Sequence, residues 1–200
     1  MKTIAATILT GLLIMMMVPL ASAQLTNGSF EDPQMAGAYY LLPPNSTAIP
    51  GWTTIDSGVE WFQPLAYGGD PAPDGLFAVD IANYTYMAGG LQQTFTTDPG
   101  TEYHINFFLG TQQTNGRDGT CEIIVEADGQ TQTFTMVNHS AEAVWETKTF
   151  LFTADDFNAD LTFRCLQNAN YHFAYIDAVG TAGTVATSNE SWGGVKSLYR

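Results

Sequence analysis

The stretch Gly89 to Gly110, GGLQQTFTTDPGTEYHINFFLG, indicates the fold class. In both halves of this stretch the apolar side chains recur at every second position, which is typical of half-buried β-strands. The positions that share a face are Leu91, Gln93 and Phe95 in the first half and Tyr103, Ile105, Phe107 and Leu109 in the second. Between them, Asp98-Pro99-Gly100 supplies a preset φ and then a residue free to take a positive φ. We therefore expect a hairpin of two strands joined at a Pro-Gly turn.

Short runs of the same kind follow one another along the chain, beginning with a short strand before Pro33. The further runs cover residues 49–55, 59–62, 77–81, 121–126, 132–137, 145–154, 161–166 and 175–179. The pair Asp128-Gly129 between two of them is a strong hairpin signal. About ten or eleven strands with no convincing helix before the tail predict a sandwich or barrel. Alternation in Phe77 to Ile81 and in Phe150 to Phe152 favours two sheets that bury a shared apolar layer.

The first 23 residues have the features of a secretory signal peptide. Lys2 precedes an apolar run from Ile8 to Leu20, and the small residues Ala21-Ser22-Ala23 form an A-x-A cleavage site. A membrane anchor is the alternative, but the apolar run is short for a span. We expect cleavage near Ala23, a secreted or cell-surface location, no membrane span in the mature chain, and one domain over residues 24–180.

Residues 181–190 are mostly Gly, Ala, Thr and Ser, which predicts a flexible linker. Beyond it, residues 191–200 place Trp192, Val195 and Tyr199 at three- and four-residue spacing, with Lys196 near the end, as in a short amphipathic helix. Such a short helix is marginal until it docks on another surface. We interpret the tail either as an attachment or sorting signal for a surface partner or as a segment that packs on its own domain.

Charge and cysteine content limit the partners and the compartment. Six Lys and Arg face twenty Asp and Glu, a formal charge of −14 that becomes −15 when Lys2 leaves with the signal peptide. Such a surface argues against nucleic acid and anionic lipid as partners.

Cys121 and Cys165 each lie in phase with the apolar face of a predicted strand. They form either a disulfide, which an oxidising compartment permits, or two buried thiols.

An ordered set of short motifs resembles the DUF642, or choice-of-anchor C, family of wall-associated sandwich proteins. The motifs are Asn27-Gly28-Ser29-Phe30-Glu31, Ile49-Pro50-Gly51-Trp52, Val59-Glu60-Trp61, Asp74-Gly75, Ala78-Val79-Asp80, the stretch Gln93 to Phe107, Trp145, Phe150 to Ala154, Leu161 to Phe163 and Ile176-Asp177. The resemblance covers about residues 25–180. It implies a galactose-binding-like jelly roll.

The resemblance also implies a structural calcium ion where the first strand meets the last. Carried over by position, its ligands are Glu31 and Asp177. Carboxylates are suitable ligands because calcium prefers oxygen atoms. The family more often has a second polar residue where Ala178 stands, and the alternative is a pair of solvated edge carboxylates.

Aromatic side chains in loops are candidates for sugar binding, because a ring can pack on the apolar C–H face of a sugar while amide and carboxylate groups bind its hydroxyls. The candidates are Tyr39, Tyr40, Trp61, Tyr67, Tyr84, Tyr86 and Tyr171. Each tyrosine can instead cover its own loop, and Trp61 is divided between core and cleft.

The sequence contains no G-x-S-x-G elbow, no H-E-x-x-H motif and no phosphate-binding loop. We therefore predict a secreted, non-catalytic module that binds a polysaccharide or envelope glycan. The alternatives are a structural surface or matrix protein and, less favoured, a carbohydrate-active hydrolase. A groove lined by tyrosines favours the first, a flat apolar patch the second, and paired buried acids with raised pKa the third.

Overall fold

The computed structural model describes residues 25–67, 69–82, 87–167, 171–181 and 185–186. The expected signal peptide, Tyr84, Tyr86 and the tail with Trp192, Val195, Lys196 and Tyr199 lie outside the described residues. The strands are β1 Tyr39–Leu42, β2 Thr53–Asp56, β3 Val59–Phe62, β4 Ala78–Asp80, β5 Gly89–Thr96, β6 Thr101–Thr111, β7 Thr120–Ala127, β8 Gln130–Val137, β9 Val144–Thr153, β10 Asn158–Cys165, β11 Tyr175–Thr181 and β12 Val185–Ala186. A short 3₁₀ helix, η1, spans Pro64–Tyr67.

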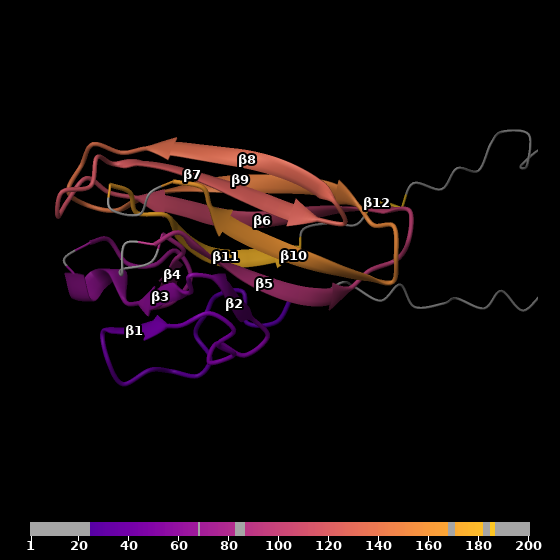
Figure 1. Ribbon diagram of the computed structural model, residues 1–200, viewed down its shortest axis with the longest axis horizontal. Helices are drawn as coiled ribbons and strands as arrows, with labels where there is room; N and C mark the ends of the chain where they lie inside the picture. The colour runs from indigo at the N-terminus through magenta and orange to yellow at the C-terminus, as the bar shows by residue number, and fades with distance from the viewer. Residues whose placement is uncertain (1–24, 68, 83–86, 168–170, 182–184, 187–200) are drawn as a thin grey trace, which may run out of the picture.

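The strands form two antiparallel sheets that pack as a β-sandwich (Figure 1). One sheet has five strands in the order β2-β5-β10-β7-β8. The other has seven, in the order β1-β3-β4-β11-β6-β12, with β9 also paired to β6. The expected all-β sandwich is confirmed. Among the described residues, no helix is long and apolar enough to cross a membrane.

The expected pairing of the two strands within Gly89 to Gly110 is wrong. β5 pairs with β2 and β10 in one sheet, whereas β6 pairs with β9, β11 and β12 in the other. The turn that ends at Gly100, whose φ is +80°, therefore carries the chain across the sandwich instead of back along one sheet. The inward faces of both strands are buried as expected, and they meet each other, with the Phe95 and Tyr103 ring centroids 6.1 Å apart.

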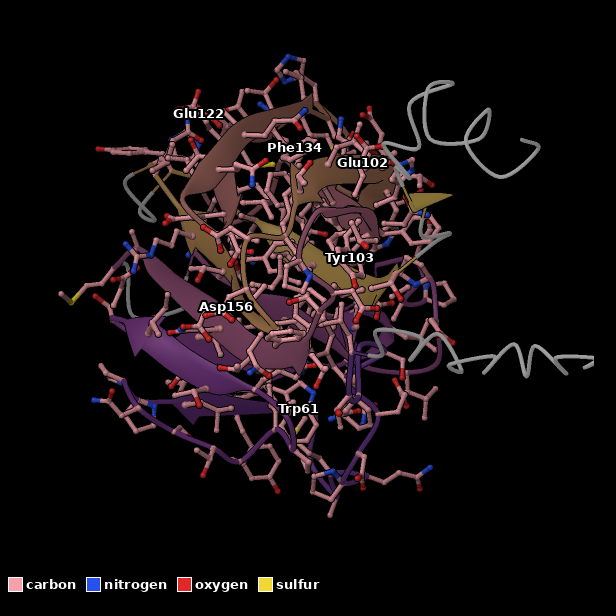
Figure 2. The ribbon with its side chains drawn as sticks, turned by 90° about the vertical axis from the view of Figure 1, so that its right-hand side faces the viewer. Trp61, Glu102, Tyr103, Glu122, Phe134 and Asp156 are labelled. Carbon is pink, nitrogen blue, oxygen red and sulfur yellow. The ribbon has the colours of Figure 1, made fainter. Side chains whose placement is uncertain are left out.

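The main core fills the space between the two sheets. Phe107 of β6 packs edge-to-face on Phe134 of β8 and on Phe163 of β10, at centroid distances of 5.2 and 5.1 Å. Figure 2 shows Phe134 and Tyr103 among the side chains of this interior. A second, smaller cluster of buried side chains lies apart from the main core and consists of Phe62, Ala72, Ala78, Ala143, Phe173 and Tyr175.

The β7–β8 hairpin matches the sequence prediction. Asp128 and Gly129 connect the strands with φ of 48° and 69°, so both residues have a positive φ, as a two-residue type I′ turn requires. In this hairpin Cys121 is buried, and Cys165 is buried on the neighbouring β10.

Both cysteines are free in the structure, so of the two alternatives it contains the pair of buried thiols. The strand register explains this result. Cys165 is opposite Ile123, which makes Cys121 its diagonal neighbour. Diagonal neighbours lie about 7–8 Å apart, whereas the Cα atoms of a disulfide lie about 4.4–6.8 Å apart.

The expected first strand before Pro33 is also wrong, because residues 25–33 form turns. Asn27 and Phe30 have positive φ values of 50° and 58°, and buried tryptophans fix this segment. The indole N–H groups of Trp52 and Trp61 donate to the carbonyls of Asn27 and Phe30, both at 3.0 Å. Trp61 is only 3% exposed and belongs to the main core, so of the two alternatives for this residue the structure contains the core position and not the cleft.

Candidate functional site

Two carboxylates lie side by side on the seven-stranded sheet, on the face turned away from the main core. Glu60 of β3 is opposite Asp80 of β4, and Asp80 is in turn opposite Tyr175 of β11. These residues face outward because Trp61, Val79 and Ile176, their neighbours in the chain, are buried in the core. The strand register thus places Glu60, Asp80 and Tyr175 in one row across three strands.

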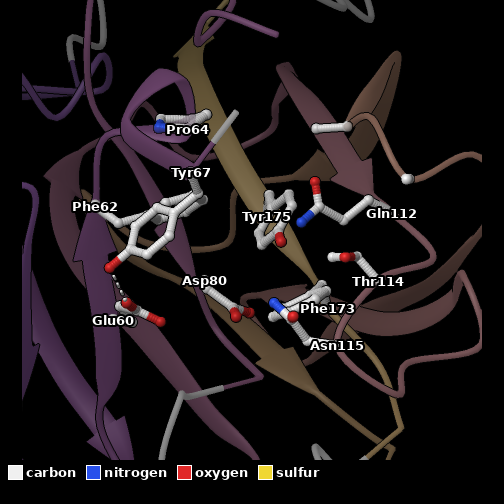
Figure 3. Close-up of a pocket in the computed structure, with 12 residues that line it drawn as sticks. Glu60, Phe62, Pro64, Tyr67, Asp80, Gln112, Thr114, Asn115, Phe173 and Tyr175 are labelled. Carbon is white, nitrogen blue, oxygen red and sulfur yellow. Dashed lines mark hydrogen bonds between the residues drawn. The ribbon is translucent and has the colours of Figure 1, made fainter. Parts of the chain in front are cut away.

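This row forms the floor of a pocket of about 180 Å³. One wall is η1 with Pro64 and Tyr67, and the opposite wall comes from the segment after β6 and from the loop before β9 (Figure 3). The lining residues are Glu60, Phe62, Pro64, Tyr67, Asp80, Gln112, Thr114, Asn115, Ala141, Ala143, Phe173 and Tyr175. The pocket therefore combines two acids, amide and hydroxyl groups, and four aromatic rings.

Tyr67 provides the aromatic wall. Its ring lies 6.2 Å from that of Phe62 on the pocket side and 6.1 Å from that of Tyr39. The Tyr67 hydroxyl donates to Glu60 Oε1 over a long 3.5 Å, as the dashed line in Figure 3 shows. Tyr39 shares this face because it lies opposite Phe62 in the β1–β3 register. Tyr39 and Tyr67 thus form an exposed aromatic surface that continues from the pocket toward the edge strand β1.

The two carboxyl groups are buried, and burial changes the protonation of both. Burial and, to a smaller extent, the charge of Asp80 together raise the pKa of Glu60 to about 7. Burial likewise raises the pKa of Asp80 to about 7, against the N–H groups of Ala82 and Ala174, which donate to its Oδ1 at 2.9 and 3.2 Å. These two amides hold the Asp80 side chain in one orientation. Near neutral pH the pair is therefore poised between protonated and ionised forms.

Arg117 lies behind this site. It is buried, its guanidinium carbon lies 4.4 Å from the centroid of the Phe173 ring, and its Nη1 donates to the carbonyl of Asn115 at 3.1 Å. Its positive charge lowers the pKa of Glu60 and Asp80, in opposition to burial. Arg117 thereby fixes the segment that carries Asn115 and partly offsets the acidic floor.

The structure brings only some of the predicted ligand residues to this pocket. Tyr67 lines it and Tyr39 adjoins it. Tyr40 lies opposite Trp61 and so points to the other face of the sheet. Tyr171 is exposed in the loop before β11 and is not a lining residue.

Sequence reasoning did not select Glu60, Asp80, Tyr175 or Phe173 as site residues. A signal was present, because Glu60 and Asp80 each interrupt a short apolar strand at a position out of phase with its buried neighbours. An acid at such a position faces the outer side of a sheet, and two adjacent strands with this pattern bring their acids together. The pattern does not show that loops cover these acids and bury them.

The predicted metal ligands Glu31 and Asp177 meet at one turn. Glu31 Oε1 accepts the N–H groups of Leu76 and Phe77 at 2.7 and 2.6 Å, and Asp177 Oδ2 accepts the N–H of Asp74 at 2.9 Å. Asp177 is fully buried, so it is not a solvated edge carboxylate. Burial raises its pKa to about 8, with smaller contributions from the charges of Asp74 and Glu31.

These carboxylate oxygens accept main-chain N–H groups, which hold the turn at residues 74–77. Asp177 Oδ1 accepts a further N–H, that of Ala178, at 2.6 Å. Within the described segments, no group of three or more His, Cys, Asp and Glu side chains is arranged to hold a metal ion. A calcium ion at Glu31 and Asp177 would need main-chain carbonyls to complete its coordination, and it stays a prediction.

A second hollow lies on the five-stranded sheet and differs in chemistry. Its lining residues are Gln92, Thr94, Glu126, Asp128, Gly129, Asn158, Asp160, Thr162 and Arg164. None of these described side chains is aromatic, so they offer no ring on which a sugar could pack. The pocket at Glu60 and Asp80 is therefore the stronger candidate.

The fold and the pocket define an all-β sandwich with a small acidic and aromatic site on one sheet. Residues 23–180 match the family described as "Protein of unknown function (DUF642)", and the chain belongs to this family. No curated protein matches the chain.

Solved structures of similar fold include carbohydrate-binding modules. TmCBM61, solved in complex with β-1,4-galactotriose, is 13% identical over 79% of this chain and 96% of its own, with a TM-score of 0.46. A structure described as "CBM4 structure and function" is 18% identical over 79% of this chain and 99% of its own, with a TM-score of 0.41. The "Family 16 Carbohydrate Binding Module-2" is 18% identical over 62% of this chain and 85% of its own, with a TM-score of 0.40. These similarities concern the fold alone.

Proposed function

We propose that this protein is a non-catalytic module that binds a carbohydrate in the pocket above Glu60 and Asp80. The observation that carries the proposal is the meeting of two buried carboxyl groups with the wall formed by Tyr67. Sugars present hydroxyl groups around an apolar ring face. Carboxyl oxygens accept hydrogen bonds from the hydroxyl groups, and aromatic rings pack on the apolar face.

The opposite wall supplies further polar groups for sugar hydroxyls. Gln112 and Asn115 line it, and an amide side chain can both donate and accept hydrogen bonds. The site rests on strands and short connections, and Asp80 is oriented by two main-chain N–H groups. Such fixed polar groups bind with little loss of side-chain entropy.

Binding of the full chain to a panel of plant and bacterial polysaccharides tests this function. We expect saturable binding that Tyr67→Ala and Glu60→Gln weaken at least tenfold. Tyr39 and Tyr40 provide a matched comparison, because they are neighbours in β1, are 47% and 44% exposed, and lie on opposite faces. Tyr39→Ala should weaken binding and Tyr40→Ala should not. Absence of binding to every polysaccharide would contradict the proposal and favour a structural role through protein contacts.

The carboxyl pair also supports a second candidate, glycoside hydrolysis, which uses two carboxylic acids with one raised pKa. Hydrolysis requires the two groups to flank the scissile bond. Here they come from directly opposite positions on adjacent strands of one floor, and Asp80 Oδ1 is occupied by two N–H groups. We therefore favour binding. Release of reducing sugar that is lost in both Glu60→Gln and Asp80→Asn would instead establish the hydrolase.

We further propose that the module acts outside the cytoplasm and holds calcium at Glu31 and Asp177. The sequence supports export through residues 1–23, and the juxtaposition of Glu31 with Asp177 at one turn supports the ion. Titration with calcium should raise the unfolding temperature, and chelation should reverse the rise. An unchanged unfolding temperature up to millimolar calcium would contradict this site.

An attachment role for residues 191–200 rests on their amphipathic pattern and is tested by deletion of the tail.

A further inference from the structure

The charged side chains that line the pocket are all acidic. Among the described residues that line it are two acids, Glu60 and Asp80, and no Lys, Arg or His. Arg117 approaches from behind Phe173, but it does not line the cavity. A ligand in the pocket therefore contacts acceptor groups with no positive side chain to neutralise a negative substituent.

The pocket is also small. A volume of about 180 Å³ lies below the roughly 300–1,000 Å³ typical of sites for drug-sized ligands. Only one sugar ring fits such a space, and the next unit of a glycan would lie outside it. The exposed rings of Tyr67 and Tyr39 continue from the mouth of the pocket, at 6.1 Å from each other, and provide a surface for that unit.

We propose, building on the carbohydrate-binding function, that the pocket selects an uncharged sugar residue through its hydroxyl groups and rejects uronic acid residues. A uronate carboxylate in this space would face both Glu60 and Asp80, and like charges at an interface disfavour binding strongly. Neutral hydroxyl groups meet no such repulsion and can donate to the carboxyl oxygens.

The protonation of the two acids decides the pH at which the selectivity is measured. Burial raises the pKa of Glu60 and Asp80 to about 7. At pH 8 both groups are therefore mostly ionised, and the floor of the pocket presents negative charge to a uronate.

Matched oligosaccharides test the selectivity with the full chain. The probes are β-1,4-linked glucose, galactose, mannose and xylose oligomers, compared with galacturonate, mannuronate and glucosamine oligomers, by titration calorimetry at pH 8. We expect at least one neutral oligomer to bind, and every uronate oligomer to bind at least tenfold more weakly. Glu60→Gln should reduce this discrimination because it removes one of the two negative charges.

The outcomes separate this inference from the proposed function. Binding of a uronate at least as tightly as any neutral oligomer, with loss in Tyr67→Ala, would retain a carbohydrate site and overturn the selectivity. Preferential binding of glucosamine oligomers that fades at high salt would also overturn it. Absence of binding to all probes would overturn both. Tyr40→Ala serves as the control, because its side chain lies on the opposite face of β1.

Discussion

Glu60 and Asp80 make the stability of this protein depend on pH. Burial raises the pKa of each to about 7, from ordinary values of 4.5 and 3.8. The folded state therefore binds protons more tightly than the unfolded chain. The resulting stabilisation is complete below about pH 4 and is lost as the pH rises through about 7.

We expect the free energy of unfolding to fall between pH 5 and pH 8 by on the order of 2–3 kcal/mol for each of the two groups, because about two pH units of this range lie between the unfolded and the folded pKa. Denaturant titrations at several pH values measure this. Asp80→Asn retains an acceptor for the two N–H groups and should make the fall shallower, by the contribution of this one carboxyl group. The slope near pH 8 should remain, because Asp177 titrates at about 8. A stability that rises between pH 5 and pH 8 would contradict these assignments.

Glu31 stabilises the turn before β4 through two main-chain hydrogen bonds. Glu31→Ala leaves the N–H groups of Leu76 and Phe77 without their acceptor and should cost about 1–3 kcal/mol. Asp32→Ala is the matched control, because this neighbouring acid is exposed, and it should change stability by less than about 0.5 kcal/mol. Equal effects of the two substitutions in urea denaturation would exclude this role for Glu31.

The residues that the sequence failed to assign are those whose surroundings depend on distant loops. Trp61 is an aromatic residue next to an acid, which suits a cleft, yet alternation along β3 turns it inward and Glu60 outward. Tyr67 was identified from its loop position, and η1 does present it at the pocket. Burial of Glu60 and Asp80 was not predictable, since it depends on η1 and on the segment after β6.

At the level of elements, the β7–β8 hairpin depends on its two-residue turn. Gly129 has a φ of 69° with no atom within 4 Å of an added Cβ, so only backbone strain opposes a larger residue. Gly129→Ala should cost about 1–2 kcal/mol, the usual penalty of a left-handed conformation for an L-residue. Gly180→Ala is the control, because an added Cβ there also meets no atom within 4 Å and no positive φ is present. Equal unfolding midpoints for the two variants would contradict the turn assignment.

Strands were predicted more reliably than their partners. The alternation of apolar residues in β5 and β6 correctly identified both buried faces, because it reports which side of a strand avoids water. It does not report which strand lies alongside. The Pro-Gly turn suited a hairpin, but β5 and β6 lie in different sheets, and Phe95 packs edge-to-face on Tyr103 across the sandwich.

For the molecule as a whole, burial in the core limits the reaction of the two cysteines with thiol reagents. Cys121 and Cys165 are buried, and burial raises the pKa of their thiols to about 12 and about 11. A thiol reagent at pH 8 should modify neither residue in the native protein and both in denaturant. Modification without denaturant would show that the sandwich opens near β7 and β10, and absence of any reaction in denaturant would show that the disulfide had formed.

The crossing of the chain at Gly100 also governs the order in which the protein can fold during synthesis. β5 has only β2 as a partner until β10 emerges, and β6 waits for β9 and β11, so no early segment forms a complete sheet. Such long-range pairing slows folding and leaves unpaired strand edges exposed in the meantime. A nascent chain shorter than about 165 residues therefore lacks part of β10 and all of β11, and it exposes unpaired strand edges that favour aggregation.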